Sequence, residues 1–242
     1  MLLKGEARAL AGDFALAEVD LAAARDADPQ NLRYLIAYAW LQQREGHYKE
    51  ALTTLKSAQE FTTPAIPFRA AVSYFYLGLN AQAAQACEDA LRIDPDFSEA
   101  YLLLGAVRLQ QQDFQGAQST FQRAASLKPD AALFHILLGV AFYKRGHLQR
   151  SARELNRALA LDPQAAPAYF YRAQVLAIQG EQRKAIADLE TAVALNPHYR
   201  KAYAELARLY SAAGQPERAA AALAKESAEL RRVIGGLGLD TR

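Results

Sequence analysis

The sequence contains few residues that could cross-link it or anchor it. Its 242 residues include one cysteine, Cys87, and one methionine. A single cysteine cannot form an intrachain disulfide, which is usual in a reducing compartment. No apolar run approaches the ~18 residues that a membrane span requires, and residues 1–5 are too short an apolar start for a signal peptide. We therefore expect a cytoplasmic protein without a membrane span, although an exported or trimmed chain would have the same composition.

The chain also lacks an excess of charge of either sign. Its 28 Lys and Arg residues against 26 Asp and Glu residues leave a formal net charge of +2. Proteins that bind nucleic acids usually cluster Lys and Arg, whereas here these residues are scattered. Half of the residues are hydrophobic and there are 12 Tyr and 10 Phe, which argues for a packed core and against disorder. We expect no nucleic-acid partner.

Groups that could perform catalysis are not brought together by any recognisable motif. His47 and His147 fall in equivalent turn positions, His135 falls in a packing position, and His198 follows a proline. Cys87 falls in a core position, where a thiol is inert. No His, Cys, Asp or Glu residues show the spacing of metal ligands, and the glycines occur singly instead of in a phosphate-binding loop. The sequence therefore predicts no enzyme activity, no cofactor and no metal.

A period of 34 residues organises the chain. Pro95, Pro129, Pro163 and Pro197 lie at this spacing, three of them after Asp or Asn. A regular repeat of this length indicates stacked supersecondary units, each too small to bury its apolar face alone. The period divides residues 1–234 into seven units and leaves a tail, 235–242, that we expect to be flexible. The units are 1–31, 32–63, 64–97, 98–131, 132–165, 166–199 and 200–234.

Small residues recur at three fixed positions of the unit. The eighth position is always Gly or Ala, the twentieth is Ala or Ser, and the twenty-seventh is Ala until Glu226. Two helices approach closely only where the facing side chains are small, so these positions indicate an antiparallel helix pair in every unit. A residue that favours positive φ separates the two helices, usually Gly and once Gln112. The proline then ends the second helix.

These residues resemble the pattern of the tetratricopeptide repeat family. One match consists of Leu104-Gly105, Asp113-Phe114, Ala117, Phe121, Ala124 and Pro129, and a second of Leu138-Gly139, Phe142, Gly146, Ala158 and Pro163. The resemblance covers residues 1–233 and implies an all-α fold, a right-handed α-α superhelical solenoid of about seven repeats in one domain. The 35-residue RNA-reading helical repeat fits less well, because the period is 34 and its polar base-reading positions are missing.

Three stretches depart from the family pattern. The second unit is two residues short and has Phe61-Thr62-Thr63-Pro64 in place of Asp-Pro, which predicts an irregular joint. The first unit lacks the start of its first helix, so the chain is expected to begin abruptly or to be a fragment. The last unit continues as an Ala-rich helix with a polar outer face, as a terminal repeat requires.

The resemblance implies a ligand groove lined by one face of the first helix of each unit. On that face the central units are apolar and the flanking units are basic. The predicted groove residues are Trp40, Phe68, Val72, Phe75, Tyr76, Leu102, Leu109, Ile136, Val140, Tyr143, Phe170 and Ile178. The predicted basic flanks are Arg33, Arg44, Lys201 and Arg208. Some of these side chains could instead pack against neighbouring helices, but so large an exposed apolar stripe is usually a binding surface.

We expect the groove to bind an amphipathic helix or an extended peptide of a partner protein whose identity the sequence does not give. Some family members bind C-terminal tails through a clamp of Lys, Asn and Arg. Only Lys201 matches that clamp here, so no such tail is expected. Two alternatives stay open. One is weak self-association through the apolar segment 233–239 of an otherwise monomeric chain, and the other is a regulatory arm of a larger protein.

Overall fold

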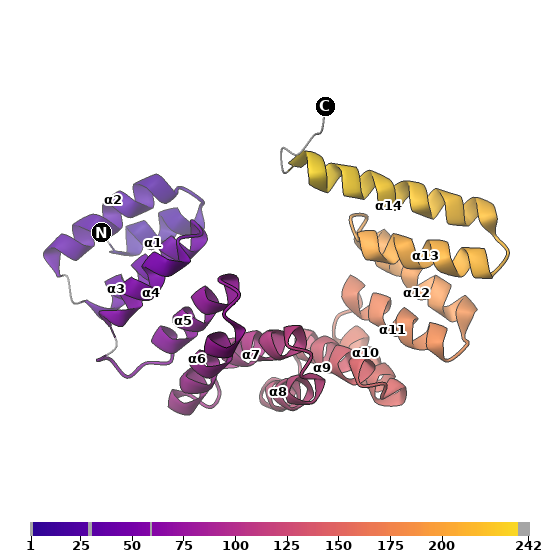
Figure 1. The fold of residues 1–242 in the computed structure, drawn as a ribbon, viewed down its shortest axis with the longest axis horizontal. Helices are drawn as coiled ribbons and strands as arrows, with labels where there is room; N and C mark the ends of the chain where they lie inside the picture. The colour runs from indigo at the N-terminus through magenta and orange to yellow at the C-terminus, as the bar shows by residue number, and fades with distance from the viewer. Residues whose placement is uncertain (1, 29–30, 59, 237–242) are drawn as a thin grey trace. The chain divides into compact units, whose positions relative to one another are not determined.

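The computed structural model describes residues 2–28, 31–58 and 60–236, in which every regular element is an α-helix (Figure 1). Consecutive helices pack in seven pairs within these ranges, so the predicted all-α fold of about seven helix pairs is confirmed. The helices are α1 (Leu2–Leu10), α2 (Phe14–Ala27), α3 (Leu32–Arg44), α4 (Tyr48–Lys56), α5 (Ala65–Tyr76), α6 (Asn80–Ile93), α7 (Ser98–Gln110), α8 (Phe114–Leu127), α9 (Ala132–Lys144), α10 (Leu148–Leu161), α11 (Ala166–Ile178), α12 (Gln182–Leu195), α13 (Arg200–Ala212) and α14 (Pro216–Gly236).

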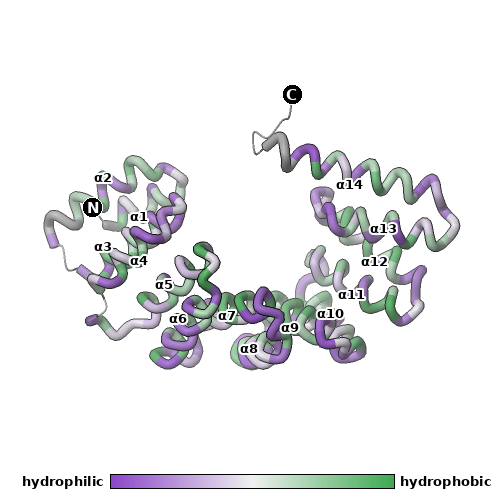
Figure 2. The backbone as a smooth tube through the Cα atoms, in the orientation of Figure 1, coloured by the Kyte–Doolittle hydropathy of each residue, from purple (hydrophilic) through white to green (hydrophobic). Residues whose placement is uncertain are grey.

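The helices form two compact units. The N-terminal unit, Met1–Leu127, contains α1–α8, and the C-terminal unit, Lys128–Arg242, contains α9–α14. Within single helices hydrophobic and hydrophilic residues alternate along the chain, as α14 shows in Figure 2. In helices of mixed composition, such as α10 and α14, this alternation leaves an apolar stripe that packs against the paired helix, whereas α9 is apolar over most of its length.

The turn inside each helix pair requires a residue with positive φ. Six of these turns use glycine, with φ between 70° and 85°. The exception is Gln112 between α7 and α8, with φ 61°, the one non-glycine residue with positive φ in the described part of the chain. The predicted role of the turn glycines is therefore confirmed, including the position where glutamine replaces glycine.

The Asp-Pro and Asn-Pro pairs end the second helices by a shared local geometry. Asp94, Asp162 and Asn196 all have extended backbone, with φ from −131° to −137° and ψ from 91° to 98°. A following proline disfavours the helical region for these residues. Their side-chain oxygens each accept a hydrogen bond, 2.9–3.0 Å long, from the backbone N–H two residues later. The side chain thus replaces the helix with a turn that leads to the next pair.

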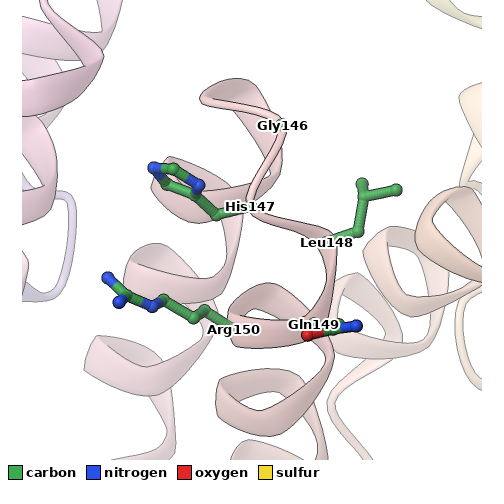
Figure 3. A pocket seen from close by; sticks show the side chains of 5 residues that line it. All are labelled: Gly146, His147, Leu148, Gln149 and Arg150. Carbon is green, nitrogen blue, oxygen red and sulfur yellow. The ribbon is translucent and has the colours of Figure 1, made fainter.

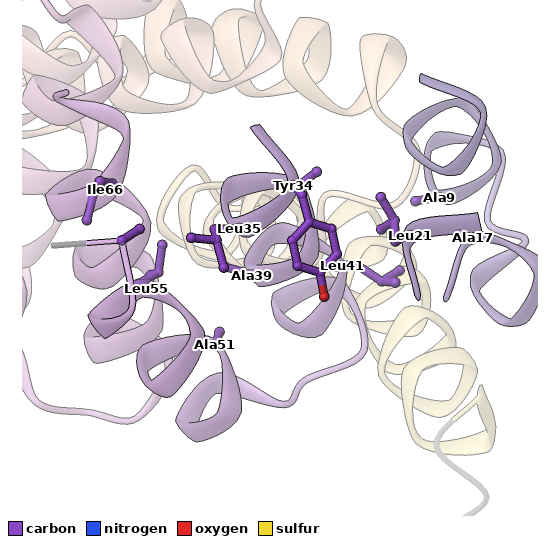
Figure 4. Packing of buried hydrophobic residues seen from close by; sticks show 12 residues of the cluster. Ala9, Ala17, Leu21, Tyr34, Leu35, Ala39, Leu41, Ala51, Leu55 and Ile66 are labelled. Carbon is purple, nitrogen blue, oxygen red and sulfur yellow. The ribbon is translucent and has the colours of Figure 1, made fainter. Parts of the chain in front are cut away.

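The small-residue positions are buried where the helices of a pair meet. Ala17, Ala51, Ala83 and Ala117 are fully buried in the N-terminal unit. Figure 4 shows part of that unit's core, in which side chains from α1 to α5 form one cluster. In the C-terminal unit an equivalent cluster joins α11 to α14 and includes Leu189, Leu206 and Tyr210. These contacts hold the first helix of each pair in place, and the predicted groove lies on that helix.

The second repeat and the last helix differ from their equivalents. Helix α4 has 9 residues, whereas α6, α8, α10 and α12 have 14 each. It ends at Lys56, before the stretch Phe61–Pro64 where an irregular joint is predicted. Helix α14 has 21 residues and continues through Gly236, so the first two residues of the expected tail are helical. Residues 237–242, which include the end of the apolar segment 233–239, lie outside the described residues.

Candidate functional site

The candidate site is a cavity of about 270 Å³ in the N-terminal unit, where α3, the start of α4 and α5 meet. Four of the predicted site residues line it together: Trp40, Arg44, Val72 and Tyr76. Three further residues line the same cavity without having been predicted: Gln43, Tyr48 and Arg69. We call these seven residues the Trp40 pocket. The pocket is more polar than the apolar groove that the sequence predicts, because an amide and two guanidinium groups contribute to its wall.

One wall of the Trp40 pocket is aromatic. The rings of Tyr48 and Tyr76 stack with their centroids 4.8 Å apart and their planes 5° from parallel. Phe75 meets the other side of Tyr76 edge-on, with the centroids 5.6 Å apart. Tyr76 nevertheless stays 62% exposed. Stacking restricts the motion of an exposed ring, so Tyr76 offers an ordered apolar surface to a ligand.

Gln43 joins α3 to α5 at the floor of the pocket. Its buried side-chain amide donates to the Arg69 backbone oxygen over 2.6 Å and to Ser73 Oγ over 2.8 Å. Both donor positions of the amide are thereby used, and Gln43 Oε1 remains as an acceptor toward the Arg69 side chain. This buried polar contact between α3 and α5 therefore fixes where Arg69 lies relative to Arg44.

Two guanidinium groups of the pocket have no carboxylate partner among the described residues. The half-buried side chain of Arg69 donates to Gln43 Oε1 over 3.5 Å, which is a long hydrogen bond. Burial lowers the pKa of Arg69, because the charged form is partly removed from water. The exposed side chain of Arg44 lies over the Phe14 ring, 5.9 Å from its centroid. The pocket thus combines aromatic surface with uncompensated positive charge.

The remaining predicted residues of the N-terminal unit are half-buried or exposed. Phe68, Phe75, Leu102 and Leu109 are half-buried, and Arg33 is exposed. Phe68 packs edge-on against Phe97, with the centroids 5.1 Å apart. Helices α3, α5 and α7 are neighbours in this unit, so Leu102 and Leu109 extend the apolar surface beyond the Trp40 pocket.

In the C-terminal unit several predicted groove residues are covered by their own chain. Ile136, Val140 and Phe170 are 8%, 6% and 7% exposed. Phe170 packs against the Tyr199 ring, with the centroids 5.0 Å apart. Tyr143 is half-buried, and its hydroxyl donates to Gln174 Oε1 over 3.4 Å. A role for these residues in ligand binding stays a prediction. In this structure Ile136, Val140 and Phe170 contribute to packing.

Three other predicted residues of the C-terminal unit are exposed. Ile178 is 59% exposed, and Lys201 and Arg208 also face solvent. Arg208 Nε donates to Glu205 over 2.8 Å, so its charge is already paired. Their assignment to a ligand site remains a prediction.

The positions of Arg69, Gln43 and Tyr48 in their units explain how they come to line the pocket. Arg69 is the sixth residue of the unit 64–97, whereas the groove residues predicted in that unit, Phe68, Val72, Phe75 and Tyr76, are its fifth, ninth, twelfth and thirteenth. At roughly 100° per residue, position 6 lies only about 20° from position 13, so Arg69 and Tyr76 share a face. Gln43 occupies position 12 of its unit, which is the position of Phe75 in the next one. Tyr48 begins the second helix of its pair, outside the helices that were considered.

Other hollows lie at the pair turns and between second helices. Gly146–Arg150 borders a hollow at the start of α10, where His147 and Arg150 extend to one side of the turn and Leu148 to the other (Figure 3). His147 and His47 are both exposed, as predicted for turn residues. A more apolar cavity of about 370 Å³ lies between α12, α13 and α14.

The buried ionisable side chains have structural roles. Cys87 is fully buried, and burial raises the pKa of its thiol to about 12, so it remains protonated. His135 is buried, as its packing position predicts, with Nδ1 2.8 Å from Glu154 and Nε2 3.0 Å from the Pro129 backbone oxygen. Among the described residues no three His, Cys, Asp or Glu side chains form a possible metal site. No helix in the same ranges is long and apolar enough to cross a membrane.

Comparison with protein families identifies the repeat. One model described as tetratricopeptide repeat matches residues 68–132, 106–166 and 136–197, and a second matches residues 176–229. These matches span more than half of the sequence, and the chain belongs to the tetratricopeptide repeat family. Domains of this family generally mediate protein–protein interactions and are typically not catalytic. A search of curated proteins finds no match.

Solved structures show the same fold. A tetratricopeptide repeat protein from Parabacteroides merdae aligns with a TM-score of 0.74 and 24% identity, over 94% of this chain and 91% of that one. YrrB, described as having an unusual peptide-binding site, aligns with a TM-score of 0.62 and 20% identity, over 75% of this chain and 95% of its own. The anaphase-promoting-complex assembly Cut9–Hcn1 gives a TM-score of 0.73 and 19% identity, over 90% of this chain and 44% of that one.

Proposed function

We propose that this chain is a non-catalytic interaction module that binds a peptide or helix of a partner protein on the first helices of its repeats. In the N-terminal unit the proposed surface runs from the Trp40 pocket on α3 and α5 to Leu102 and Leu109 on α7. The observation that carries the proposal is the meeting of Trp40, Arg44, Val72 and Tyr76 in one cavity. These residues come from two repeats and were selected from sequence position alone.

The composition of the surface supports a peptide ligand. Aromatic residues and arginine dominate the binding energy of protein interfaces, and the Trp40 pocket contains three aromatic residues and two arginines. Tyr76 is a large hydrophobic side chain that remains mostly exposed. YrrB, a structural neighbour, is described as a peptide-binding protein of the same fold.

A paired capture experiment tests this proposal. One bait is the wild-type chain, and the second carries Val72→Glu and Tyr76→Glu, which place two charges in the pocket. A matched control bait carries Ala81→Glu and Gln85→Glu, two exposed positions on α6. Circular dichroism and the melting temperature establish that all three are folded, and mass spectrometry identifies the proteins retained from native lysate.

The expected result is a protein retained by the wild type and by the α6 control but lost with the pocket variant. Titration calorimetry with the purified partner should show weaker binding to the pocket variant than to the wild type or the α6 control. Equal recovery by all three baits would contradict the proposal for this surface. Recovery of the chain itself as the only retained protein would instead favour self-association, which sedimentation of the purified chain at several concentrations would measure.

A further inference from the structure

The Trp40 pocket holds a cation that no carboxylate of the described residues neutralises. Arg69 is half-buried, and its side chain makes one hydrogen bond, 3.5 Å long, to a neutral amide. Glu45, which follows Arg44 in the chain, lies 3.6 Å from His47 Nδ1 and forms no ion pair with either arginine. A partly desolvated charge without a counter-charge is unfavourable, so a ligand that supplies one gains affinity at this point.

We infer that the Trp40 pocket binds an acidic side chain of the partner peptide, held between Arg69 and Arg44, with apolar residues of that peptide on Tyr76 and α7. This inference rests on the proposed function and specifies the chemistry of the partner. A guanidinium group presents two parallel donors that match the two oxygens of a carboxylate. Arg69 provides that donor pair inside the cavity, and Arg44 adds a second positive charge at its exposed rim.

The surroundings favour an acidic residue inside a peptide over the carboxylate at a chain end. Half-buried apolar side chains lie on the helices that flank the pocket: Phe14 on α2, beside Arg44, and Phe75 and Leu109 on α5 and α7. A peptide that continues in both directions covers more of this surface than one that ends in the pocket. The favourable free energy of binding rises with the apolar area that is buried, so a peptide that continues in both directions binds more tightly.

Arginines in comparable cavities of the C-terminal unit are already neutralised. Between α12 and α14, Arg218 Nη2 donates to Glu190 over 2.5 Å, and Tyr210 Oη donates to the same carboxylate oxygen. Beside α11, Arg172 forms two hydrogen bonds of 2.7 Å with Asp188. In these cavities the carboxylate comes from the chain itself, which indicates that the missing one in the Trp40 pocket is supplied from outside.

The test begins with a displayed library of random 12-residue peptides, selected in parallel on four purified proteins. These are the wild type, Arg69→Gln, the double variant Arg44→Gln and Arg69→Gln, and the pocket variant Val72→Glu with Tyr76→Glu. Circular dichroism confirms that each is folded. We expect wild-type peptides to share an internal Asp or Glu followed or preceded by apolar residues, and this acidic preference to disappear with either arginine variant.

The strongest wild-type peptide is then synthesised unchanged, with its acidic residue replaced by the amide, and with an amidated C-terminus, for fluorescence anisotropy titration. Glu→Gln or Asp→Asn in the peptide should weaken binding to the wild type by about tenfold or more, as expected for loss of a charge-assisted pair. The same change should alter binding to Arg69→Gln by less than about twofold, because the partner group is already absent. Arg69→Lys, which keeps the charge without the fork, should show an intermediate effect.

The outcomes separate this inference from the function on which it rests. Peptides that require Val72 and Tyr76 but show no acidic preference would overturn the inference and leave the peptide-binding proposal intact. Loss of binding on amidation of the peptide C-terminus, with no effect of Glu→Gln, would place a chain end in the pocket and would also overturn it. Failure to enrich any peptide, or enrichment that survives in the Val72→Glu and Tyr76→Glu protein, would count against both.

Discussion

Gly105 on α7 faces the ring of Phe121 on α8 so closely that a Cβ atom built on Gly105 would lie 2.2 Å from Phe121 Cε1. Phe121 is fully buried, so its ring cannot move aside without displacing its neighbours. The glycine therefore allows an aromatic ring to occupy the space between the two helices of the pair. This contact explains why the eighth position of this repeat is glycine.

Gly105→Ala should destabilise the protein by about 1–3 kcal/mol, the usual cost of overpacking a core. Gly139→Ala should cost less, since its Cβ would lie 2.8 Å from Leu155 Cγ, a less severe overlap than the 2.2 Å at Gly105. Gly139→Leu should again cost about 1–3 kcal/mol. Urea unfolding followed by circular dichroism measures all three, with Ala81→Leu on the exposed face of α6 as the control. Equal stability of Gly105→Ala and the wild type would contradict the close contact between Gly105 and Phe121.

Gln112→Gly should stabilise the protein. Gln112 has φ 61°, a conformation that disfavours residues with a Cβ atom by roughly 1 kcal/mol relative to glycine. Greater flexibility of glycine in the unfolded chain offsets part of this, so we expect a gain of about 0.5 kcal/mol. The reciprocal change, Gly146→Gln at the equivalent turn with φ 75°, should lower stability. Thermal unfolding of the two variants side by side would contradict the interpretation if both shifts had the same sign.

Two substitutions in the Trp40 pocket should change stability in opposite directions. Arg69→Met removes a half-buried charge without a carboxylate partner, so the free energy of unfolding should stay the same or rise. Gln43→Ala removes the buried amide that donates to the Arg69 backbone and to Ser73, which should cost about 1–3 kcal/mol. Urea denaturation distinguishes them. A large loss of stability in Arg69→Met would identify Arg69 as a structural residue and weaken its assignment to ligand binding.

The protein should lose stability as the pH rises above about 8.5, the ordinary pKa of a cysteine thiol. Burial raises the pKa of Cys87 to about 12 in the folded chain. Between these values the unfolded state loses the thiol proton and the folded state keeps it, so unfolding becomes more favourable with increasing pH. Below the lower value both states hold the proton and this group contributes no pH dependence.

Urea midpoints between pH 7.5 and pH 10 measure this dependence, with Cys87→Ala as the comparison. The variant should show a shallower decline over the same range, although its absolute stability is lower. Above pH 10 tyrosines should add to the decline in both proteins, because the pKa values of Tyr199 and Tyr210 are also raised to about 12. Identical slopes in the two proteins below pH 10 would show that the thiol does not contribute.

The sequence by itself determined the repeat, its helix pairs and its turns. These features depend on local geometry and on small residues that recur at fixed positions, such as Ala117 and Gly139, so they can be read without knowing the neighbours. It also placed Trp40 and Arg44 on one face of α3, and Val72 and Tyr76 on the equivalent face of α5, because helical periodicity specifies the direction of each side chain.

Only the tertiary structure decided which of these side chains remain accessible and what lies beside them. Ile136 and Phe170 occupy groove positions but are buried, because the size of the side chains on the adjoining helices determines whether a position is covered. Arg69 and Tyr48 complete the pocket from outside the expected positions, since a cavity is formed by several helices at once. Direction on one helix is a local property, whereas exposure and unpaired charge depend on every element packed around it.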